Sequence, residues 1–247
     1  MSTAGSSHNP RPVSSNTTYA LAAVAVVLIG LIVFAAYKWS AEPPPAVRNE
    51  GYGPVREAAV QVTTTTPDGV IRLGRPDAAK TVDIFEDPIC PACGAMETAY
   101  GQELAQKIDE GKLAVNYHLV TFLDPQSRSK DYSTRATAAN LCVAQGGSGP
   151  TYSKFHETLF TKKQPDEGGS DLSNPALATI ATESGAPESV AACINNGTQS
   201  EAAKSAAAKN LADLDARTDN KAATPAIYDG TTKIDWQDEN WVVNLAP

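Results

Sequence analysis

Two cysteines, Cys90 and Cys93, separated by Pro91 and Ala92, constrain the fold of this 247-residue chain more than any other feature. They directly follow an apolar, strand-like run at residues 81–86 and directly precede a run with helical periodicity. A helix that begins at the first cysteine leaves backbone N–H groups without partners beside its sulfur. Such a position lowers the pKa of a thiol, and two thiols at this spacing can close a small disulfide. The pattern therefore predicts a strand, a redox-active turn and a helix in succession.

The segments around this turn predict a strand–helix–strand unit. Apolar residues after the cysteines recur at every fourth position, the spacing of one buried helix face, and they are Met96, Tyr100, Leu104 and Ile108. The helix is expected to end at Glu110-Gly111, and a second strand to follow within residues 113–122. Parallel strands joined by a helix form a right-handed crossover, and functional groups gather at the carboxyl ends of such strands. Cys90 should therefore lie at the functional edge of a parallel pair.

The remaining segments complete an α/β domain with an inserted helical subdomain. Strand patterns occur at residues 60–62, 70–73, 81–86, 113–122, 226–228 and 233–236. From about residue 124 to about residue 217 the strand signals disappear, and five helical patterns follow one another. We expect one globular domain over residues 59–247, with the helical insertion between its two β-containing parts.

The N-terminal region differs from this domain in composition. Residues 19–37 contain no charged side chain and approach the roughly 20 apolar residues that cross a bilayer. We expect a transmembrane signal-anchor there, with residues 1–18 as a cytoplasmic tail and residues 38–58 as a flexible, proline-containing linker. A cleaved signal peptide is the alternative, but the apolar region of such a peptide is usually about 7–15 residues long.

Charge and cysteine content restrict the partners and the compartment. The chain has 28 acidic and 20 basic side chains, a formal net charge of −8 at pH 7, so its surface should repel nucleic acid. Four cysteines that make two plausible pairs fit an oxidising compartment better than the cytosol. We expect a single-pass protein of the cell membrane whose domain lies outside the cytoplasm.

Several motifs together resemble one known family. Residues 86–90 read Glu-Asp-Pro-Ile-Cys, with an acidic pair ahead of the first cysteine, and Thr224-Pro225 stands before a late strand. The helical block contains three further motifs: Leu141-Cys142, Phe155-His156-Glu157-Thr158-Leu159-Phe160 and Ala192-Cys193-Ile194-Asn195. Over roughly residues 70–240 the chain resembles the thioredoxin fold of membrane-anchored, DsbA-like thiol:disulfide oxidoreductases of bacterial cell envelopes. It departs from that family at residues 219–223, which lack the Gly-Val usually found before Thr-Pro.

The helix position and the resemblance give the two cysteines different roles. Cys90 would cap the helix, where N–H groups and the helix dipole stabilise its thiolate, and Cys93 would be the buried resolving thiol. Pro91 suits the first helical position because it lacks an N–H, and Ala92 stands where many relatives have histidine or an aromatic residue. A Cys90 pKa lowered from about 8.5 to about 5.5 would stabilise the reduced form at pH 7 by about 2 kcal/mol. We therefore expect a disulfide of intermediate oxidising strength.

The resemblance also implies roles for residues away from the cysteine turn. The Thr224–Pro225 bond would be cis and would face the disulfide, and the backbone of Thr224 would pair with an extended substrate segment. Glu86 would shuttle the proton of Cys93, although a carboxylate at the end of a strand is more commonly a solvated residue. His118 and His156, on a predicted strand and a predicted helix, are interpreted as structural.

The other two cysteines, Cys142 and Cys193, lie on separate predicted helices. They form either a structural disulfide or two buried free thiols, and the resemblance favours the disulfide. A structural zinc site needs four ligands, and these cysteines have neither a second Cys-x-x-Cys nor a paired histidine motif nearby. A purely structural bridge between Cys90 and Cys93 would close a ring too small to contribute much stability. We expect no metal and no cofactor.

The sequence leaves two classes of function open. In the first, the protein donates its Cys90–Cys93 disulfide to reduced, unfolded secreted proteins and is reoxidised by a membrane enzyme of the DsbB or vitamin K epoxide reductase type. A reductase serving cytochrome maturation is the alternative within this class. An isomerase is disfavoured because residues 41–69 are too short and too polar for a dimerisation domain. We expect a monomer. In the second class, the protein is a non-catalytic envelope binding protein that retains the fold.

Overall fold

The structure is a computed structural model that describes residues 46–65 and 68–247. The predicted cytoplasmic tail and transmembrane span, residues 1–18 and 19–37, lie outside the described residues, as does the first part of the predicted linker. Among the helices of the described part of the chain, none combines the length and the apolar character that a bilayer crossing requires.

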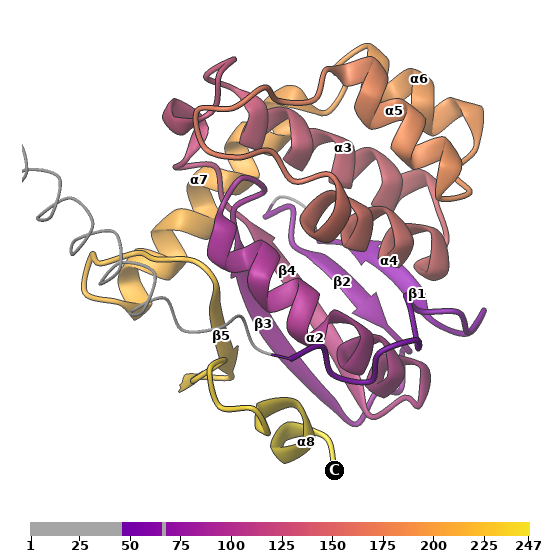
Figure 1. Ribbon diagram of the computed structural model, residues 1–247, viewed down its shortest axis with the longest axis vertical. Coiled ribbons are helices and arrows are strands. Elements are labelled where there is room, and N and C mark those ends of the chain that lie inside the picture. Colours follow the sequence, from indigo (N-terminus) through magenta and orange to yellow (C-terminus); the bar gives the residue numbers. More distant parts are fainter. Residues whose placement is uncertain (1–45, 66–67) are drawn as a thin grey trace, which may run out of the picture. The chain divides into compact units, whose positions relative to one another are not determined.

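A six-stranded mixed sheet forms the centre of the domain (Figure 1). Its strands lie in the order β1-β2-β4-β3-β5-β6, with bounds β1 Gln61–Thr64, β2 Ile71–Gly74, β3 Lys80–Glu86, β4 Leu113–Leu119, β5 Ala226–Asp229 and β6 Thr232–Ile234. Strands β3 and β4 pair in parallel, and the other neighbouring pairs are antiparallel. The expected parallel strand–helix–strand unit is therefore confirmed, with β3 in the interior of the sheet.

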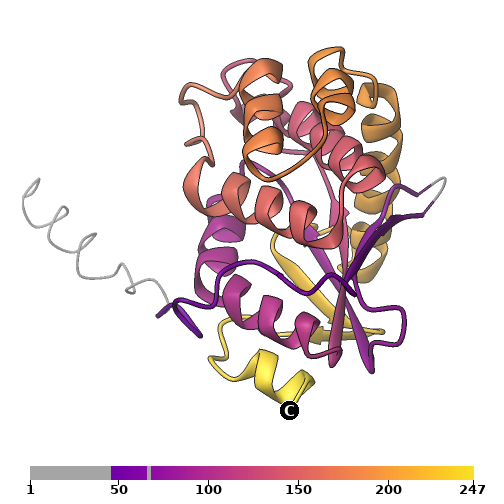
Figure 2. The same ribbon diagram turned by 90° about the vertical axis from the view of Figure 1, so that its right-hand side faces the viewer.

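The helices cover both faces of this sheet (Figure 2). Their bounds are α2 Pro91–Asp109, η1 Asp124–Gln126, α3 Tyr132–Gly146, α4 Gly149–Glu157, the π-helical turn η2 Thr158–Lys162, α5 Asn174–Glu183, α6 Glu188–Asn195, α7 Ser200–Arg217 and α8 Trp241–Leu245. Successive side chains of a strand point to opposite faces, so Ile84 of β3 packs into the main core on the side of α2. Phe85 packs on the other side with Leu214 of α7.

Helix α2 buries the face that its periodicity predicts. The four residues of the stripe, Met96, Tyr100, Leu104 and Ile108, are each at most 1% exposed. Burying a large apolar side chain stabilises a fold by about 1.5–3 kcal/mol, so this face attaches α2 firmly to the sheet. The helix in turn fixes the position of Cys90 at its N-terminal end.

The helical insertion matches its predicted extent, with five α-helices, α3 to α7, between residues 132 and 217. A disulfide of 2.06 Å joins Cys142 of α3 to Cys193 of α6 within it. The sequence patterns did not predict α8, whose Trp241 is 2% exposed and packs edge-on against Tyr100 of α2.

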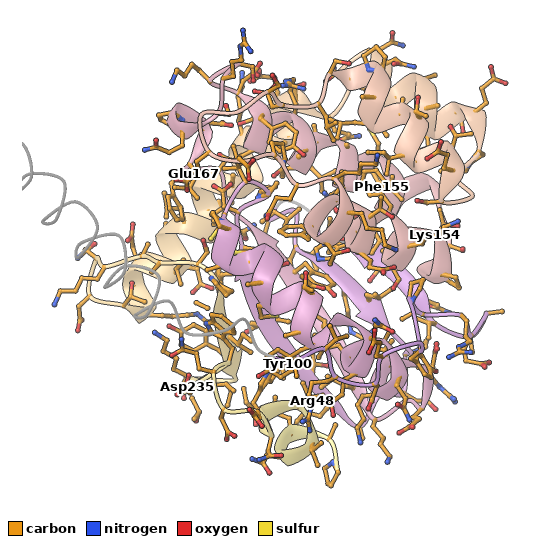
Figure 3. The ribbon with its side chains drawn as sticks, in the orientation of Figure 1. Arg48, Tyr100, Lys154, Phe155, Glu167 and Asp235 are labelled. Atoms are coloured by element: carbon orange, nitrogen blue, oxygen red, sulfur yellow. A yellow bond between two sulfur atoms is a disulfide. The ribbon has the colours of Figure 1, made fainter. Side chains whose placement is uncertain are left out.

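The predicted flexible linker, residues 38–58, is wrong for its described part. Residues 46–57, here called the N-terminal strap, run along α2 and are held by hydrogen bonds. The Arg48 N–H donates to the Ala99 carbonyl at 2.7 Å, and Figure 3 shows Arg48 beside Tyr100 of the same helix. Val55 is 2% exposed, and its N–H donates to Ser153 Oγ of α4 at 3.0 Å.

The physical reason for this correction is the buried carboxylate of Asp109 at the end of α2. It accepts hydrogen bonds from the Tyr52 hydroxyl at 2.8 Å and from the backbone N–H groups of Arg56 and Glu57. A buried carboxylate requires such donors, and the strap supplies them. The folded domain therefore begins before residue 59.

Candidate active site

The Cys-Pro-Ala-Cys turn lies where β3 passes into α2. Cys90 occupies the N-cap position with an extended backbone, and Pro91 is the first helical residue, as predicted. The turn is closed by the Cys90 carbonyl, which accepts from the N–H groups of Cys93 at 3.1 Å and Gly94 at 3.2 Å. Both cysteines carry free thiols. The turn thus holds two sulfurs at the first turn of a helix whose N–H groups face them.

The environment of Cys90 stabilises its thiolate. A hydrogen bond from the Cys93 thiol is the main cause, and together with the side chain of Thr224 and the N–H groups of Cys93 and Ala92 it outweighs the opposing effect of burial. These contacts lower the pKa of Cys90 from the ordinary 9.0 to about 6. The side chain is buried, at 6% exposure, but it lies nearer the surface than Cys93. Cys90 therefore has the character of a nucleophile and of a good leaving group.

Cys93 has the opposite character. Its side chain is 0% exposed, and burial raises its pKa well above the ordinary value. The hydrogen bond to Cys90 and the charge of Glu86 raise the pKa further, whereas the Asp87 N–H lowers it. A thiol in this environment reacts only when a nearby group takes its proton.

The Thr224–Pro225 loop lies directly against the nucleophile. The peptide bond between these residues is cis, and the Cys90 Sγ donates to the Thr224 carbonyl at 3.3 Å. The loop reaches this place because β5 pairs antiparallel to β3, with Ala226 opposite Phe85. The structure therefore brings the Cys90–Cys93 turn together with the Thr224–Pro225 loop, although Cys90 and Thr224 are 134 residues apart in the chain.

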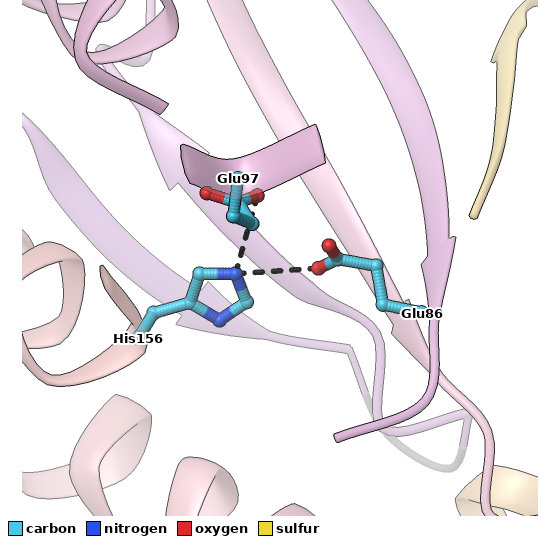
Figure 4. A group of neighbouring side chains, drawn as sticks. All are labelled: Glu86, Glu97 and His156. Atoms are coloured by element: carbon cyan, nitrogen blue, oxygen red, sulfur yellow. Dashed lines mark ion pairs between the residues drawn. The ribbon is translucent and has the colours of Figure 1, made fainter. Parts of the chain in front are cut away.

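A buried polar cluster lies beneath the turn, formed by Glu86 of β3, Glu97 of α2 and His156 of α4 (Figure 4). His156 Nε2 lies 3.2 Å from Glu86 Oε2 and 3.5 Å from Glu97 Oε1. Glu86 is 0% exposed, so the solvated carboxylate considered for this residue is wrong, and the position remains suited to a proton shuttle. His156 is more than a packing residue, since its Nε2 lies against two acidic side chains.

Burial and mutual charge set the protonation of this cluster. Burial, reinforced by the charge of Glu97, raises the pKa of Glu86 to about 8 against the effect of His156. Burial alone would lower the pKa of His156, but its contacts with both carboxylates outweigh this and raise it to about 9. Groups whose pKa values lie this close to neutrality exchange protons readily at physiological pH.

Within the described residues, this cluster is also the one set of side chains whose ligand atoms lie close enough together to hold a metal ion, within 4.8 Å of one another. When one of the two carboxyl groups is protonated, the His156 imidazolium and the other carboxylate balance each other's charge, and no metal ion is needed. The pairing therefore accounts for these three residues without an ion, and we assign no metal to them.

Comparisons with known proteins agree with this geometry. A family model described as "Thioredoxin" matches residues 65–242. The chain belongs to the thioredoxin family. One similar solved structure is the MdbA thiol-disulfide oxidoreductase from Corynebacterium matruchotii, with TM-score 0.67 and 26% identity over 76% of this chain and 92% of that chain. Oxidised DsbA from Mycobacterium tuberculosis has TM-score 0.56 and 30% identity over 76% of this chain and 94% of that chain. These matches confirm the expected α/β, thioredoxin-like fold.

Among curated proteins, the chain is similar to the serine/threonine-protein kinase PknE of Mycobacterium tuberculosis. The two are 38% identical over 183 residues, which are 72% of this chain and 31% of the kinase. The chain thus spans about a third of the length of the curated relatives it matches.

Two further residues, to which the sequence analysis gave no role, support the turn of this thioredoxin-family protein. Gln164 reaches over from the segment after η2, and its Nε2 donates to the carbonyls of Cys90 at 2.9 Å and Pro88 at 3.3 Å. Gly94 makes room for it, because a Cβ there would lie 2.2 Å from the Gln164 Oε1.

The second such residue is Asp87, which immediately follows Glu86. It accepts from the Ile89 N–H at 3.1 Å, the Leu123 N–H at 3.0 Å and the Ser133 hydroxyl. Burial raises the pKa of Asp87 to about 7 despite these donors. The acidic pair before the cysteine thus divides its roles: Asp87 braces the turn, while Glu86 faces the polar cluster.

Proposed function

We propose that the protein is an extracytoplasmic thiol:disulfide oxidoreductase that donates its Cys90–Cys93 disulfide to secreted or envelope proteins. The observation that carries this proposal is the low pKa of Cys90, about 6, beside the Thr224–Pro225 loop. At pH 7 such a thiol is about nine-tenths ionised, which stabilises the dithiol by about 1.4 kcal/mol relative to an ordinary cysteine. For a two-electron couple this makes the disulfide more oxidising by about 30 mV.

The two cysteines would divide the chemistry between them. A substrate thiolate attacks the Cys90 sulfur, the Cys90–Cys93 bond breaks, and Cys93 leaves as a thiolate that takes up a proton. The second substrate thiolate then attacks the substrate sulfur of the mixed disulfide and expels Cys90. Because the pKa of Cys90 is about 6, it leaves as a thiolate and needs no proton at pH 7. The substrate loses two electrons, and the cysteine pair gains them.

Substrate chains would bind as extended segments beside the Thr224–Pro225 loop. Main-chain hydrogen bonds at Thr224 would recognise the backbone without regard to side-chain identity. A cavity of about 380 Å³ beside the loop, lined by residues that include Pro225, Ile234 and Trp236, supplies an apolar contact. This arrangement favours broad selection of reduced, unfolded proteins.

Location and reoxidation belong to the same proposal. The uncharged stretch at residues 19–37 would anchor the protein in the cell membrane, with the domain outside the cytoplasm. The Cys142–Cys193 disulfide supports an oxidising compartment. A membrane reoxidase of the DsbB or vitamin K epoxide reductase type would then restore the Cys90–Cys93 disulfide. The protein itself would act as a monomer.

The test mixes the oxidised protein with a reduced, unfolded disulfide protein and counts the thiols lost by the substrate. Loss of two substrate thiols per oxidised molecule, abolished in Cys90→Ala, supports an oxidase. Equal inertness of the wild type and the variant would indicate a binding protein instead. The reduction potential separates the directions of catalysis, since a value near about −120 mV indicates an oxidase and one near about −270 mV a reductase.

A further inference from the structure

A cavity of about 260 Å³ lies between the N-terminal strap, α2 and α4. Figure 2 shows the indigo strap passing between these two helices. The residues that line the cavity include neither the cysteines of the turn nor the Thr224–Pro225 loop, so the proposed disulfide exchange makes no use of it. Glu50, Thr98 and Lys162 lie at its rim and are exposed. The cavity is therefore open to a molecule from solvent.

Two glycines on opposite walls leave this space open. Gly101 lies inside α2, where a glycine destabilises a helix by about 0.5–1 kcal/mol relative to alanine. Outside its own helix backbone and its chain neighbours, a Cβ at Gly101 would have one described neighbour within 4 Å, Glu97 Oε2 at 3.0 Å. A Cβ at Gly53 of the strap would meet no described atom within 4 Å. The room lies beside the Glu97 carboxylate.

Glu97 gives the cavity a polar end. Its side chain is 4% exposed, and among the described residues its Oε1 has no hydrogen-bonding partner. The nearest cationic atom is His156 Nε2 at 3.5 Å, and this nitrogen lies closer to Glu86, at 3.2 Å (Figure 4). A buried carboxylate oxygen without a donor is costly. A ligand that brings a donor to Glu97 would therefore be stabilised.

The charges around the cavity favour a cationic ligand. Four carboxyl groups lie in its wall or directly behind it, and they are Glu50, Glu86, Glu97 and Glu157. The cationic side chains of the described lining are Lys162, which pairs with Glu157 at 2.9 Å, and His156, which Glu86 and Glu97 share. If a ligand cation pairs with Glu97, His156 remains as the partner of Glu86, and the proton that otherwise neutralises one of these two carboxyl groups is released. An anionic ligand would be repelled.

The remainder of the cavity is apolar. The lining residues of α2 run from Glu97 to Ile108, which corresponds to about 16 Å of helix length. The apolar lining residues are Val47, Pro54, Leu73, Leu104, Ala105 and Ile108. Sites for drug-sized ligands have volumes of about 300–1,000 Å³, so this cavity suits a smaller and narrower molecule.

We propose that this cavity is a binding site for a small primary amine, whose ammonium group pairs with Glu97 and whose alkyl or arylalkyl body lies against Leu104 and Ile108. An ammonium group provides both the positive charge and up to three hydrogen-bond donors. An alcohol of the same length offers one donor and no charge, and a carboxylate offers a charge of the wrong sign. The site is separate from the proposed disulfide exchange and does not rest on it.

The test is isothermal titration calorimetry of the full chain at pH 7 with hexylamine, 1-hexanol and hexanoate, which share one alkyl chain. An alkylamine is protonated at this pH, since amines of this type have a pKa of about 10.4. We expect saturable binding of hexylamine, at least about tenfold tighter than that of hexanol, because hydrogen bonds to charged groups are the stronger ones. Hexanoate should not bind. Equal affinities for the amine and the alcohol, binding of hexanoate, or no saturable binding of hexylamine at millimolar concentration would each overturn the proposal.

Two variants change the two ends of the argument separately. Glu97→Gln removes the charge and should weaken hexylamine at least about tenfold, and hexanol by less than about twofold. Gly101→Leu fills the space beside Glu97 and should weaken both ligands at least about tenfold, while leucine favours the helix more than glycine does. If Glu97→Gln does not fold, Gly101→Leu decides the question alone. Unchanged affinity for hexylamine in either folded variant would contradict the site.

The matched control for charge is Glu103→Gln. Glu103 is also a buried glutamate of α2, but it pairs with Arg48 at 3.7 Å and does not line the cavity. Its substitution should leave the affinity for hexylamine within about twofold of the wild type, because distant sites act independently. A loss equal to that of Glu97→Gln would overturn the assignment of Glu97 as the partner of the amine.

Histidine ring signals in NMR spectra locate the bound amine. His156 lines the cavity, whereas His118 pairs with Asp83 at 3.2 Å and is not among the lining residues. Hexylamine should therefore shift the ring signals of His156 and leave those of His118 unchanged, and the reverse pattern would place the amine elsewhere. These measurements use no disulfide substrate, so an inert wild type in the thiol assay would contradict the proposed function without affecting this result.

Discussion

The contribution of the Cys93 thiol to the reactivity of Cys90 can be measured with two substitutions. The hydrogen bond from Cys93 is the main cause of the low pKa of Cys90, about 6. A hydrogen bond to a charged group contributes about 1.5–3 kcal/mol, which corresponds to about one to two pH units. In Cys93→Ala this donor is lost, so the midpoint of Cys90 ionisation should rise to about 7–8. In Cys93→Ser a hydroxyl replaces the thiol donor, and the midpoint should stay near 6.

The assay is the rate of alkylation by iodoacetamide as a function of pH. In both variants Cys90 is the single free thiol, because Cys142 and Cys193 are joined in a disulfide. Even in Cys93→Ala the midpoint should remain below the ordinary value, since the N–H groups at the start of α2 still face the sulfur. Equal midpoints near 6 in the two variants would refute the reasoning, because the helix amides alone would then account for the thiolate.

Three further outcomes follow from the structure. Replacing both Cys142 and Cys193 by alanine should lower the free energy of unfolding by about 4 kcal/mol in denaturant titrations, because the disulfide closes a loop with a sequence separation of 51. Gly94→Ala should lower the free energy of unfolding by about 1–3 kcal/mol, because its Cβ would lie 2.2 Å from Gln164 Oε1. In a double-mutant cycle, Gln164→Ala should recover part of this lost stability. The pKa of Asp87, raised to about 7, means that the native state holds a proton that the unfolded chain releases near pH 4. The free energy of unfolding should therefore fall as the pH rises from about 4 to 7, and a wild-type slope as shallow as that of Asp87→Asn would contradict this assignment.

Local periodicity was sufficient to predict the elements that build the redox turn. The i+4 stripe from Met96 to Ile108 lies on one face of α2. In β3 the apolar residues Val82, Ile84 and Phe85 are all buried, because helices cover both sides of the sheet. The N-terminal strap was misjudged because its polar composition is typical of a linker. What orders it is the distant carboxylate of Asp109, and no pattern within residues 46–57 reveals that partner.

The site was only partly predictable, because some of its residues also have partners that are distant in the sequence. The cysteines and the Thr224–Pro225 loop belong to recognisable motifs, whereas the partners of Glu86 come from two other elements. One signal was present, since Glu97 interrupts the buried face of α2 four positions after Cys93, where an apolar residue would be ordinary. His156 offered no comparable signal, because a histidine among the apolar residues of a helix is equally compatible with packing.

The position of His156 has a consequence for the evolution and engineering of this domain. The helical insertion does more than cover the sheet. Here α4 supplies the counter-charge of a carboxylate at the centre of the redox site, 3.2 Å away. Trimming the protein to its sheet and α2 would leave Glu86 and Glu97 facing each other without a cation, so a minimal version would need a substitute for this imidazole as well as a new apolar cover.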